Sequence, residues 1–294
     1  MTKPINDLHP NMGEIFKGYS DLLAEVVNFG THILSWDIDQ ANGGDEQLPV
    51  LLIFRNILEH LDAVSLLIRQ SSVEPSKNLL RVMFESLLNL EYMLDNDCER
   101  RGLAFLVCGY HTELKFIEKI SEDTAAHYQL KQKFKADKSM PSGLPSINIP
   151  GKREQEQRIL KILALPLYRE AEAEYQALLS AGKKNPSWYQ LFGGPPNIDQ
   201  LATKLNRQGL YELLYRTWSN TIHGQNVIKG NMTNGIDTGV AQIRNPRDAK
   251  QVTLHACNIA LLLFQFFITK RLPQEKNKLS IWYKTVQPEI SKLR

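Results

Sequence analysis

The chain is poor in cysteine and carries almost no excess of charge. Its three cysteines, Cys98, Cys108 and Cys257, are far apart and form no C-x-x-C pair, which argues against a zinc site and against a disulfide framework. Lys and Arg number 35 and Asp and Glu number 32, so no global positive field indicates nucleic-acid binding. The overall charge does not exclude a local basic patch.

Several motifs that would identify an enzyme are missing. The sequence holds no P-loop, no G-x-G-x-x-G and no G-x-S-x-G. These absences argue against a glycine-rich phosphate-binding loop and against the nucleophile elbow of hydrolases. It also has no H-x-x-x-H and no E-x-x-H pair, the spacings that place metal ligands on one helix face. We therefore expect no metal ion and no cofactor.

Long apolar runs and alternating strand patterns are also lacking. The most apolar run, Ile259 to Ile268, contains Gln265 and is shorter than the roughly 20 residues that span a bilayer. It predicts a core helix and no membrane association. The first residues, MTKPINDLHPN, lack the apolar segment of a secretion signal, which predicts a cytoplasmic protein.

Apolar residues recur instead at spacings of three and four through most of the 294 residues, which predicts an all-α fold. We expect a single domain over residues 1–294, with a core at about 50–135 and 198–270 and a helical insertion at about 136–197. Within this insertion, long loops rich in proline and glycine flank a helix. The expected helices cover about residues 12–36, 50–70, 73–94, 99–134, 153–180 with a kink at Pro166, 198–206, 210–225 and 246–270.

One predicted helix gathers unusual polar residues in the stretch YRTWSNTIHG, residues 215–224. On a wheel turning about 100° per residue, Arg216, Ser219, Asn220 and His223 share one face. An ordinary solvent-facing surface is one interpretation. A recognition site is the other, because Ser, Asn and His are weaker helix formers than the Lys and Glu that usually cover such a face.

A second polar stripe crosses the helix predicted to end near Leu94. Apolar residues cover most of that helix, which predicts burial, yet Asn78, Arg81, Glu85 and Asn89 line up along it. Charges on a buried helix must be paired or must line a site. Arg81 and Glu85 either pair with each other at i, i+4, or face the Arg216 and His223 surface across a polar cleft, where a carboxylate would orient the imidazole.

These residues resemble a bacterial family described only as a domain of unknown function. The similarity spans about residues 51–267 and rests on the helix with Arg81 and Glu85 and on a later Tyr-x3-Ser-x3-His-Gly pattern that begins at Tyr215. Arg216 and His223 also fit the R-x6-H end of the R-x4-6-H motif of HEPN domains. Thr217 differs from the Asn, Asp or His that often follows the arginine in these nucleases.

The resemblance implies a HEPN-like helical bundle that cleaves RNA without a metal ion. His223 would act as general acid and base, and Arg216 would bind the scissile phosphate. Ser219 and Asn220 would hydrogen-bond phosphate or sugar, with Tyr215 in the same motif. One such helix supplies only one histidine, so the resemblance implies a homodimer.

HEPN proteins are common in toxin–antitoxin and phage-defence systems, so the resemblance also implies a toxin or defence effector, with an antitoxin or regulatory protein as a partner. The competing hypothesis is a non-catalytic helical module that binds a nucleotide or a protein. In it, Arg81, Glu85, Ser219 and His223 would form an internal polar network. An enzyme acting on a small molecule is neither supported nor excluded by the sequence.

Overall fold

A computed structural model describes residues 10–40, 44–139, 150–216, 232–233, 239–240 and 243–294. The fold is all-α, as the sequence predicts. Its strands within these ranges are the two-residue β1 (Met232–Thr233) and β2 (Gly239–Val240), which pair antiparallel. The chain forms two compact units, one from Met1–Asp97 with Asn197–Arg294 and one from Cys98–Pro196.

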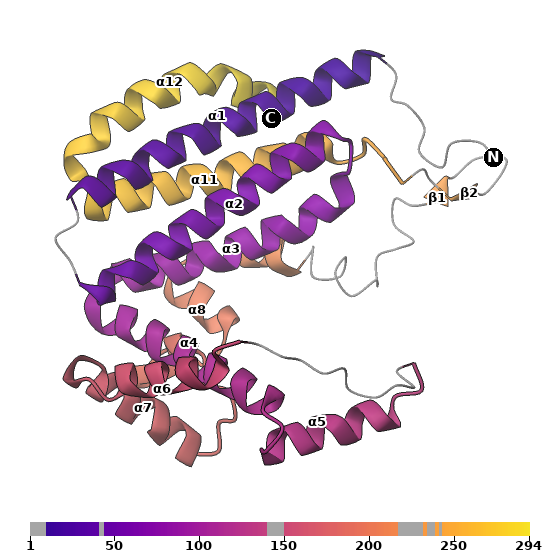
Figure 1. The fold of residues 1–294 in the computed structure, drawn as a ribbon. Coiled ribbons are helices and arrows are strands. Elements are labelled where there is room, and N and C mark those ends of the chain that lie inside the picture. Colours follow the sequence, from indigo (N-terminus) through magenta and orange to yellow (C-terminus); the bar gives the residue numbers. More distant parts are fainter. Residues whose placement is uncertain (1–9, 41–43, 140–149, 217–231, 234–238, 241–242) are drawn as a thin grey trace. The chain divides into compact units, whose positions relative to one another are not determined.

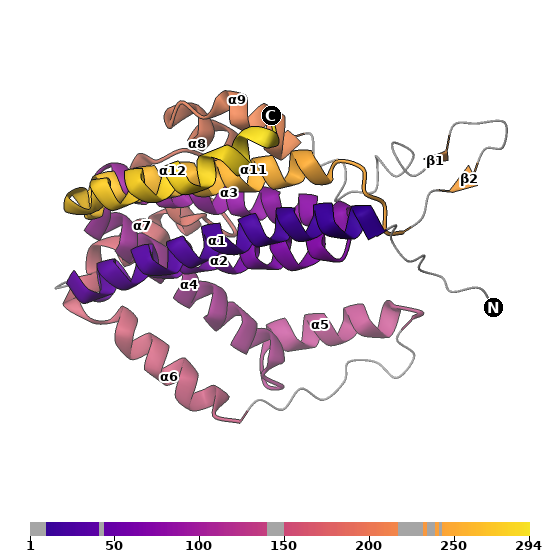
Figure 2. The ribbon, with the colours of Figure 1, turned by 90° about the horizontal axis from the view of Figure 1, so that it is seen from above.

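The first unit is built around a bundle of four long helices, α1 (Pro10–Gln40), α2 (Leu48–Arg69), α3 (Val73–Asp95) and α11 (Ala249–Arg271). In this bundle α1 packs on α2, α2 on α3, α3 on α11 and α11 on α1. The last helix, α12 (Lys276–Lys292), packs along α11 and α1, as Figures 1 and 2 show. The unit also contains the short elements η1 (Asp45–Gln47), α8 (Ile198–Lys204), α9 (Gln208–Leu210), η4 (Tyr211–Arg216) and η5 (Pro273–Glu275).

Aromatic rings fill the centre of this bundle. Phe264 of α11 meets Phe29 of α1 at 5.8 Å between ring centroids, and Phe267 meets Phe54 of α2 at 4.5 Å. Trp282 of α12 stacks on Phe29 at 4.0 Å. These contacts join four helices through side chains that the 3.6-residue period places on their inner faces.

Gly30 lies in the middle of α1, where a glycine ordinarily weakens a helix. A Cβ atom at this position would lie 2.4 Å from Leu58 Cδ2 and 3.0 Å from the ring of Phe264. The missing side chain therefore lets α1 approach α2 and α11 closely. This close packing explains why the helix continues through Gly30 although glycine has a low helix propensity.

The apolar helix α11 is long and apolar enough to cross a membrane by length and composition, the one such helix in the described part of the chain. In the fold, Leu263, Phe264, Phe267 and Ile268 are completely buried. Its apolar residues thus supply the core of the first unit, which confirms the core helix expected over Ile259–Ile268.

The second unit begins earlier in the chain than the insertion expected at 136–197, because the helices after Cys98 pack with those after residue 151. The expectation of one domain over the whole chain stays a prediction. The elements of this unit are α4 (Cys98–Ile120), α5 (Ala125–Ala136), α6 (Lys152–Leu163), η2 (Pro166–Tyr168), α7 (Arg169–Ser180) and η3 (Trp188–Gly193).

Two helices predicted in this unit are divided in the structure. The helix expected over 99–134 ends at Ile120 and restarts at Ala125, because Thr124 caps α5 by accepting a hydrogen bond from His127 N. The helix expected over 153–180 does not merely kink at Pro166. It stops at Leu163, and α7 begins at Arg169 after a 3₁₀ turn, since proline cannot continue the hydrogen-bond ladder.

Candidate functional site

The described part of the segment that carries Arg216 differs from the α-helix expected over residues 210–225. In it, α9 ends at Leu210 and η4 (Tyr211–Arg216) has π-helical geometry. A π-helix bonds i to i+5 and turns less per residue than the roughly 100° of an α-helix. Ser219, Asn220 and His223 lie outside the described residues, so their expected alignment with Arg216 stays a prediction.

The polar stripe of α3 meets this segment at Tyr215. Arg81 Nη2 donates a hydrogen bond of 2.7 Å to the Tyr215 hydroxyl, and its guanidinium carbon lies 4.1 Å from the centre of the Tyr215 ring. Arg81 Nε also donates to Glu85 Oε1 at 3.2 Å. The i, i+4 pair considered from the sequence is thus formed, and the same arginine reaches across to the second element.

Burial raises the pKa of Tyr215, and the nearby Glu85 carboxylate raises it further, although Arg81 opposes the shift. Tyr215 is consequently protonated at neutral pH, so its hydroxyl can donate a hydrogen bond but cannot serve as a base. Arg81 and Glu85 are largely shielded from solvent, with side chains 18% and 35% exposed. This cluster can hold a polar group firmly but is not strongly positive.

Arg216 lies near a pair of stacked tyrosine rings. Tyr211 and Tyr215 stack with their centroids 4.8 Å apart, and the Arg216 guanidinium lies 5.7 Å from the centre of Tyr211. Arg216 contacts two carboxylates, Glu212 at 3.2 Å and Asp199 at 3.7 Å. Its side chain is 57% exposed, so an anionic ligand can reach it by displacing these partners.

Two asparagines of the same α3 stripe have buried oxygens without a hydrogen-bond partner among the described residues. These atoms are Asn78 Oδ1 and Asn89 Oδ1. A buried amide oxygen without a partner is costly. The polar stripe therefore carries acceptors that nothing in the described part of the chain satisfies.

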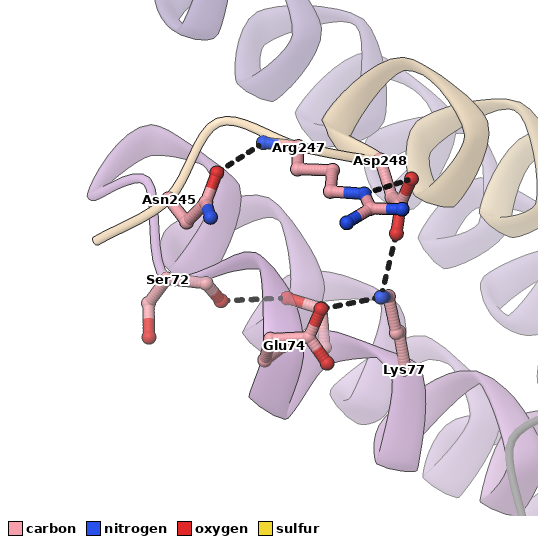
Figure 3. A network of polar contacts seen from close by, with 7 residues as sticks. Ser72, Glu74, Lys77, Asn245, Arg247 and Asp248 are labelled. Atoms are coloured by element: carbon pink, nitrogen blue, oxygen red, sulfur yellow. Dashed lines mark hydrogen bonds and ion pairs between the residues drawn. The ribbon is translucent and has the colours of Figure 1, made fainter. Parts of the chain in front are cut away.

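A second network ties the start of α3 to the chain that precedes α11 (Figure 3). Lys77 donates to Glu74 Oε1 at 2.5 Å and to Asp248 Oδ2 at 2.8 Å. Burial lowers the pKa of Lys77, but the hydrogen bonds and charges of Asp248 and Glu74 outweigh burial, so the net shift is upward. Asp248 has a φ of +65°, the left-handed region that Asp tolerates better than most residues.

The two networks sit one helical turn apart on α3, at Lys77 and Arg81. Tyr215 accepts a hydrogen bond from Arg81, and Asp248 accepts one from Lys77. Residues 216–247, which include Ser219, Asn220 and His223, connect these two attachments. Both ends of that connection are therefore fixed on one buried helix, α3.

The sequence did not indicate the partners of Arg216. Glu212 precedes Arg216 by four residues, a spacing that favours such a pair. Asp199 is seventeen positions earlier, in α8. Its contact with Arg216 depends on how α8 and η4 pack, which no local pattern encodes.

Among the residues that the structure describes, no three His, Cys, Asp or Glu side chains gather closely enough to hold a metal ion. The fold and its contacts define an all-α protein in which two arginines and two tyrosines meet over one helix of a four-helix bundle. The chain belongs to the family of unknown function DUF5677, whose profile matches residues 47–234.

This membership confirms the expected relation to a family of unknown function, while the Tyr-x3-Ser-x3-His-Gly motif and the relation to HEPN domains stay predictions. No curated protein and no solved structure matches the chain significantly.

Proposed function

We propose that this protein is a HEPN-like endoribonuclease that needs no metal ion and acts as a homodimer. The observation that carries the proposal is the position of Arg216, an exposed guanidinium at the end of a π-helical segment that Tyr215 fixes to α3. Short π-helical segments occur often at functional sites. The R-x6-H spacing then assigns His223 as the second catalytic group.

In this mechanism, neutral His223 removes the proton from the 2′-hydroxyl of RNA. The 2′-oxygen attacks the phosphorus, the bond to the 5′-oxygen breaks, and protonated His223 of the second copy donates a proton to the leaving oxygen. The products are a 2′,3′-cyclic phosphate and a 5′-hydroxyl. An imidazole suits both roles because it titrates near neutrality, and the need for two of them is the reason for a dimer.

The remaining residues would bind and position the substrate. Arg216 would stabilise the charge that develops on the phosphate, since its planar fork matches two phosphate oxygens. Ser219 and Asn220 would hydrogen-bond phosphate or sugar. Arg81 and Glu85 would hold Tyr215, and through it the segment that bears Arg216.

RNA binds Arg216 only when a phosphate displaces Glu212 and Asp199, because both carboxylates already contact its guanidinium. Such competition fits an enzyme that is inactive until a substrate or an activator displaces the carboxylates. The biological role that follows is a cytoplasmic toxin or phage-defence effector, held in check by an antitoxin or regulatory protein.

The test uses the purified full chain, labelled total RNA and tRNA, and EDTA. Wild type should cleave and leave cyclic phosphate ends, whereas Arg216→Ala and His223→Ala should each lose cleavage while keeping the circular dichroism spectrum of wild type. Arg55→Ala is the matched control, because Arg55 is also an exposed arginine paired with a glutamate four residues away. Full activity in both site variants would exclude the proposal.

A specific observation favours the alternative of a non-catalytic binding module. Arg81, Glu85 and Tyr215 satisfy one another, and Arg216 is held by two carboxylates. If these residues form a structural network, Glu85→Gln and His223→Ala should each lower the melting temperature. Each buried polar group left without a partner lowers the free energy of unfolding by about 1–3 kcal/mol. Absence of cleavage, together with such losses of stability, would support this module.

A further inference from the structure

A groove between α11 and α12 uses none of the residues of the candidate functional site. Its volume is about 610 Å³, which falls within the range of about 300–1,000 Å³ typical of small-molecule sites. One face of each helix lines it. Leu261, Gln265 and Ile268 recur at spacings of four and three on α11, and Leu279 and Tyr283 are four residues apart on α12.

The walls of the groove are mostly apolar. Leu261 of α11 and Leu279 and Tyr283 of α12 supply apolar surface to the groove. Ile268 also borders the groove, but it is completely buried by the bundle, so it offers no exposed surface to a ligand. An apolar chain that lies here would exchange contact with water for contact with these side chains, which favours binding.

The polar groups along the groove make no hydrogen bond or ion pair with any described residue. They are the side chains of Gln265, Thr269, Ser280 and Lys276 and the hydroxyl of Tyr283. Lys276 is the only charged residue among those described along the groove. The carboxylate next to it in the sequence, Glu275, is paired with Lys278 at 2.6 Å, and Lys276 has no ion-pair partner among the described residues.

We propose that this groove binds an amphipathic carboxylate, with a single apolar chain between α11 and α12 and an anionic head group beside Lys276. The apolar walls select the chain, and the lone positive charge selects an anion. The hydroxyl and amide groups of Ser280, Thr269 and Gln265 offer donors to the oxygens of the head group.

The first test titrates the full chain with cis-parinaric acid, a fluorescent fatty acid, below its micelle concentration. Saturable binding of one molecule per chain is expected. Ser280→Trp should weaken it by at least about tenfold, because the indole would fill space that a close-packed ligand needs. Gln287→Trp is the matched control, since Gln287 is exposed on α12 outside the groove, and it should bind like wild type.

The second test examines the head group. Lys276→Gln should weaken binding of the acid by about threefold, the size expected of one partly exposed charge pair, and should leave binding of the methyl ester unchanged. Lys284→Gln, on the same helix outside the groove, is the control. If acid and ester bind equally well, or if Lys276→Gln has no effect, the assignment of an anionic head group fails.

Two other outcomes would overturn the proposal. Absence of saturable binding to wild type, or full binding by Ser280→Trp, would show that the groove does not take the chain. Sedimentation of the same proteins identifies another occupant. If wild type is a dimer that Ser280→Trp dissociates, and the fatty acid does not bind, then a second copy of the chain occupies the groove.

Discussion

Arg81 and Tyr215 are 134 residues apart in the sequence, yet Arg81 Nη2 donates to the Tyr215 hydroxyl at 2.7 Å. This contact joins the polar stripe of a bundle helix to the segment that carries Arg216. Tyr215→Phe removes the hydroxyl and keeps the ring that stacks on Tyr211. The free energy of unfolding should fall by about 1 kcal/mol, the usual net value of one hydrogen bond, as measured by urea unfolding.

Tyr19→Phe is the matched control for this measurement. Tyr19 lies on α1 in the same unit, and its hydroxyl makes no hydrogen bond with a described residue. Its loss should change the free energy of unfolding by less than about 0.5 kcal/mol. Equal effects of the two substitutions would mean that the Arg81–Tyr215 bond contributes nothing to stability.

The long helices of this fold follow from the sequence because each depends on a local property, the 3.6-residue apolar period. Local spacing also offered the Arg81–Glu85 pair as one of two interpretations, since residues four apart meet on any α-helix. The π-helical segment at Tyr211–Arg216 could not be predicted in this way. Its geometry accompanies the hydrogen bond of Tyr215 to another helix, which is a tertiary contact.

The features of the candidate site also divide into those set by local sequence and those set by tertiary contacts. The sequence marks the polar stripe of α3 as a candidate, because polar residues inside an apolar pattern are visible in the sequence itself. It could not show that Asp248 would meet Lys77 or that Asp199 would meet Arg216. Those pairs join residues brought together only by the angles at which helices pack, and many packings would satisfy the same apolar pattern.

The close approach of α1 to its neighbours predicts opposite effects of the same substitution at two glycines. Gly30→Ala should lower the free energy of unfolding by about 1 kcal/mol, because overpacking costs about 1–3 kcal/mol and the gain in helix propensity offsets about 1 kcal/mol. Gly18→Ala should raise it by about 0.5–1 kcal/mol, since a Cβ there meets nothing within 4 Å. Urea unfolding of both variants gives the comparison. A stabilising Gly30→Ala would mean that Leu58 can move aside at little cost.

The ion pair of Glu91 with Arg207 should contribute far more to stability than an exposed pair. Glu91 is only 2% exposed and receives two hydrogen bonds from Arg207, at 2.7 and 2.9 Å. Arg207→Ala would leave this carboxylate buried and unpaired, so we expect a loss of about 3 kcal/mol in the free energy of unfolding. Arg55→Ala should cost less than about 1 kcal/mol, because Arg55 and Glu59 are both more than half exposed.

A double substitution separates two causes of the expected loss of stability, the uncompensated buried charge and the lost packing of the Arg207 side chain. Glu91→Leu combined with Arg207→Met replaces both charges by apolar groups, which is often nearly neutral when a buried pair is removed whole. The double variant should therefore be more stable than Arg207→Ala, as measured by urea unfolding. If the double variant is as unstable as Arg207→Ala, the loss comes from packing of the Arg207 side chain and not from an uncompensated charge.

The last prediction concerns acid pH and His255, which lies half-buried on α11. Burial lowers the pKa of His255 from its ordinary value of 6.5. Its Nε2 lies 2.6 Å from the Gln251 amide nitrogen, a contact in which the neutral ring accepts a hydrogen bond that protonation would abolish. Below pH 6.5 the unfolded chain therefore binds more protons at this residue than the folded chain does, so the free energy of unfolding rises with pH through that window.

Stability should consequently fall as the pH drops from about 7 to about 5, and His255→Gln should reduce this dependence. Urea unfolding of wild type and His255→Gln at several pH values isolates the contribution of this residue, because the other titrating groups are common to both proteins. The difference between the two curves should grow toward acid pH. Parallel curves would mean that His255 binds protons equally well in the folded and unfolded chains, and that its burial among the helices of the bundle does not disfavour the imidazolium.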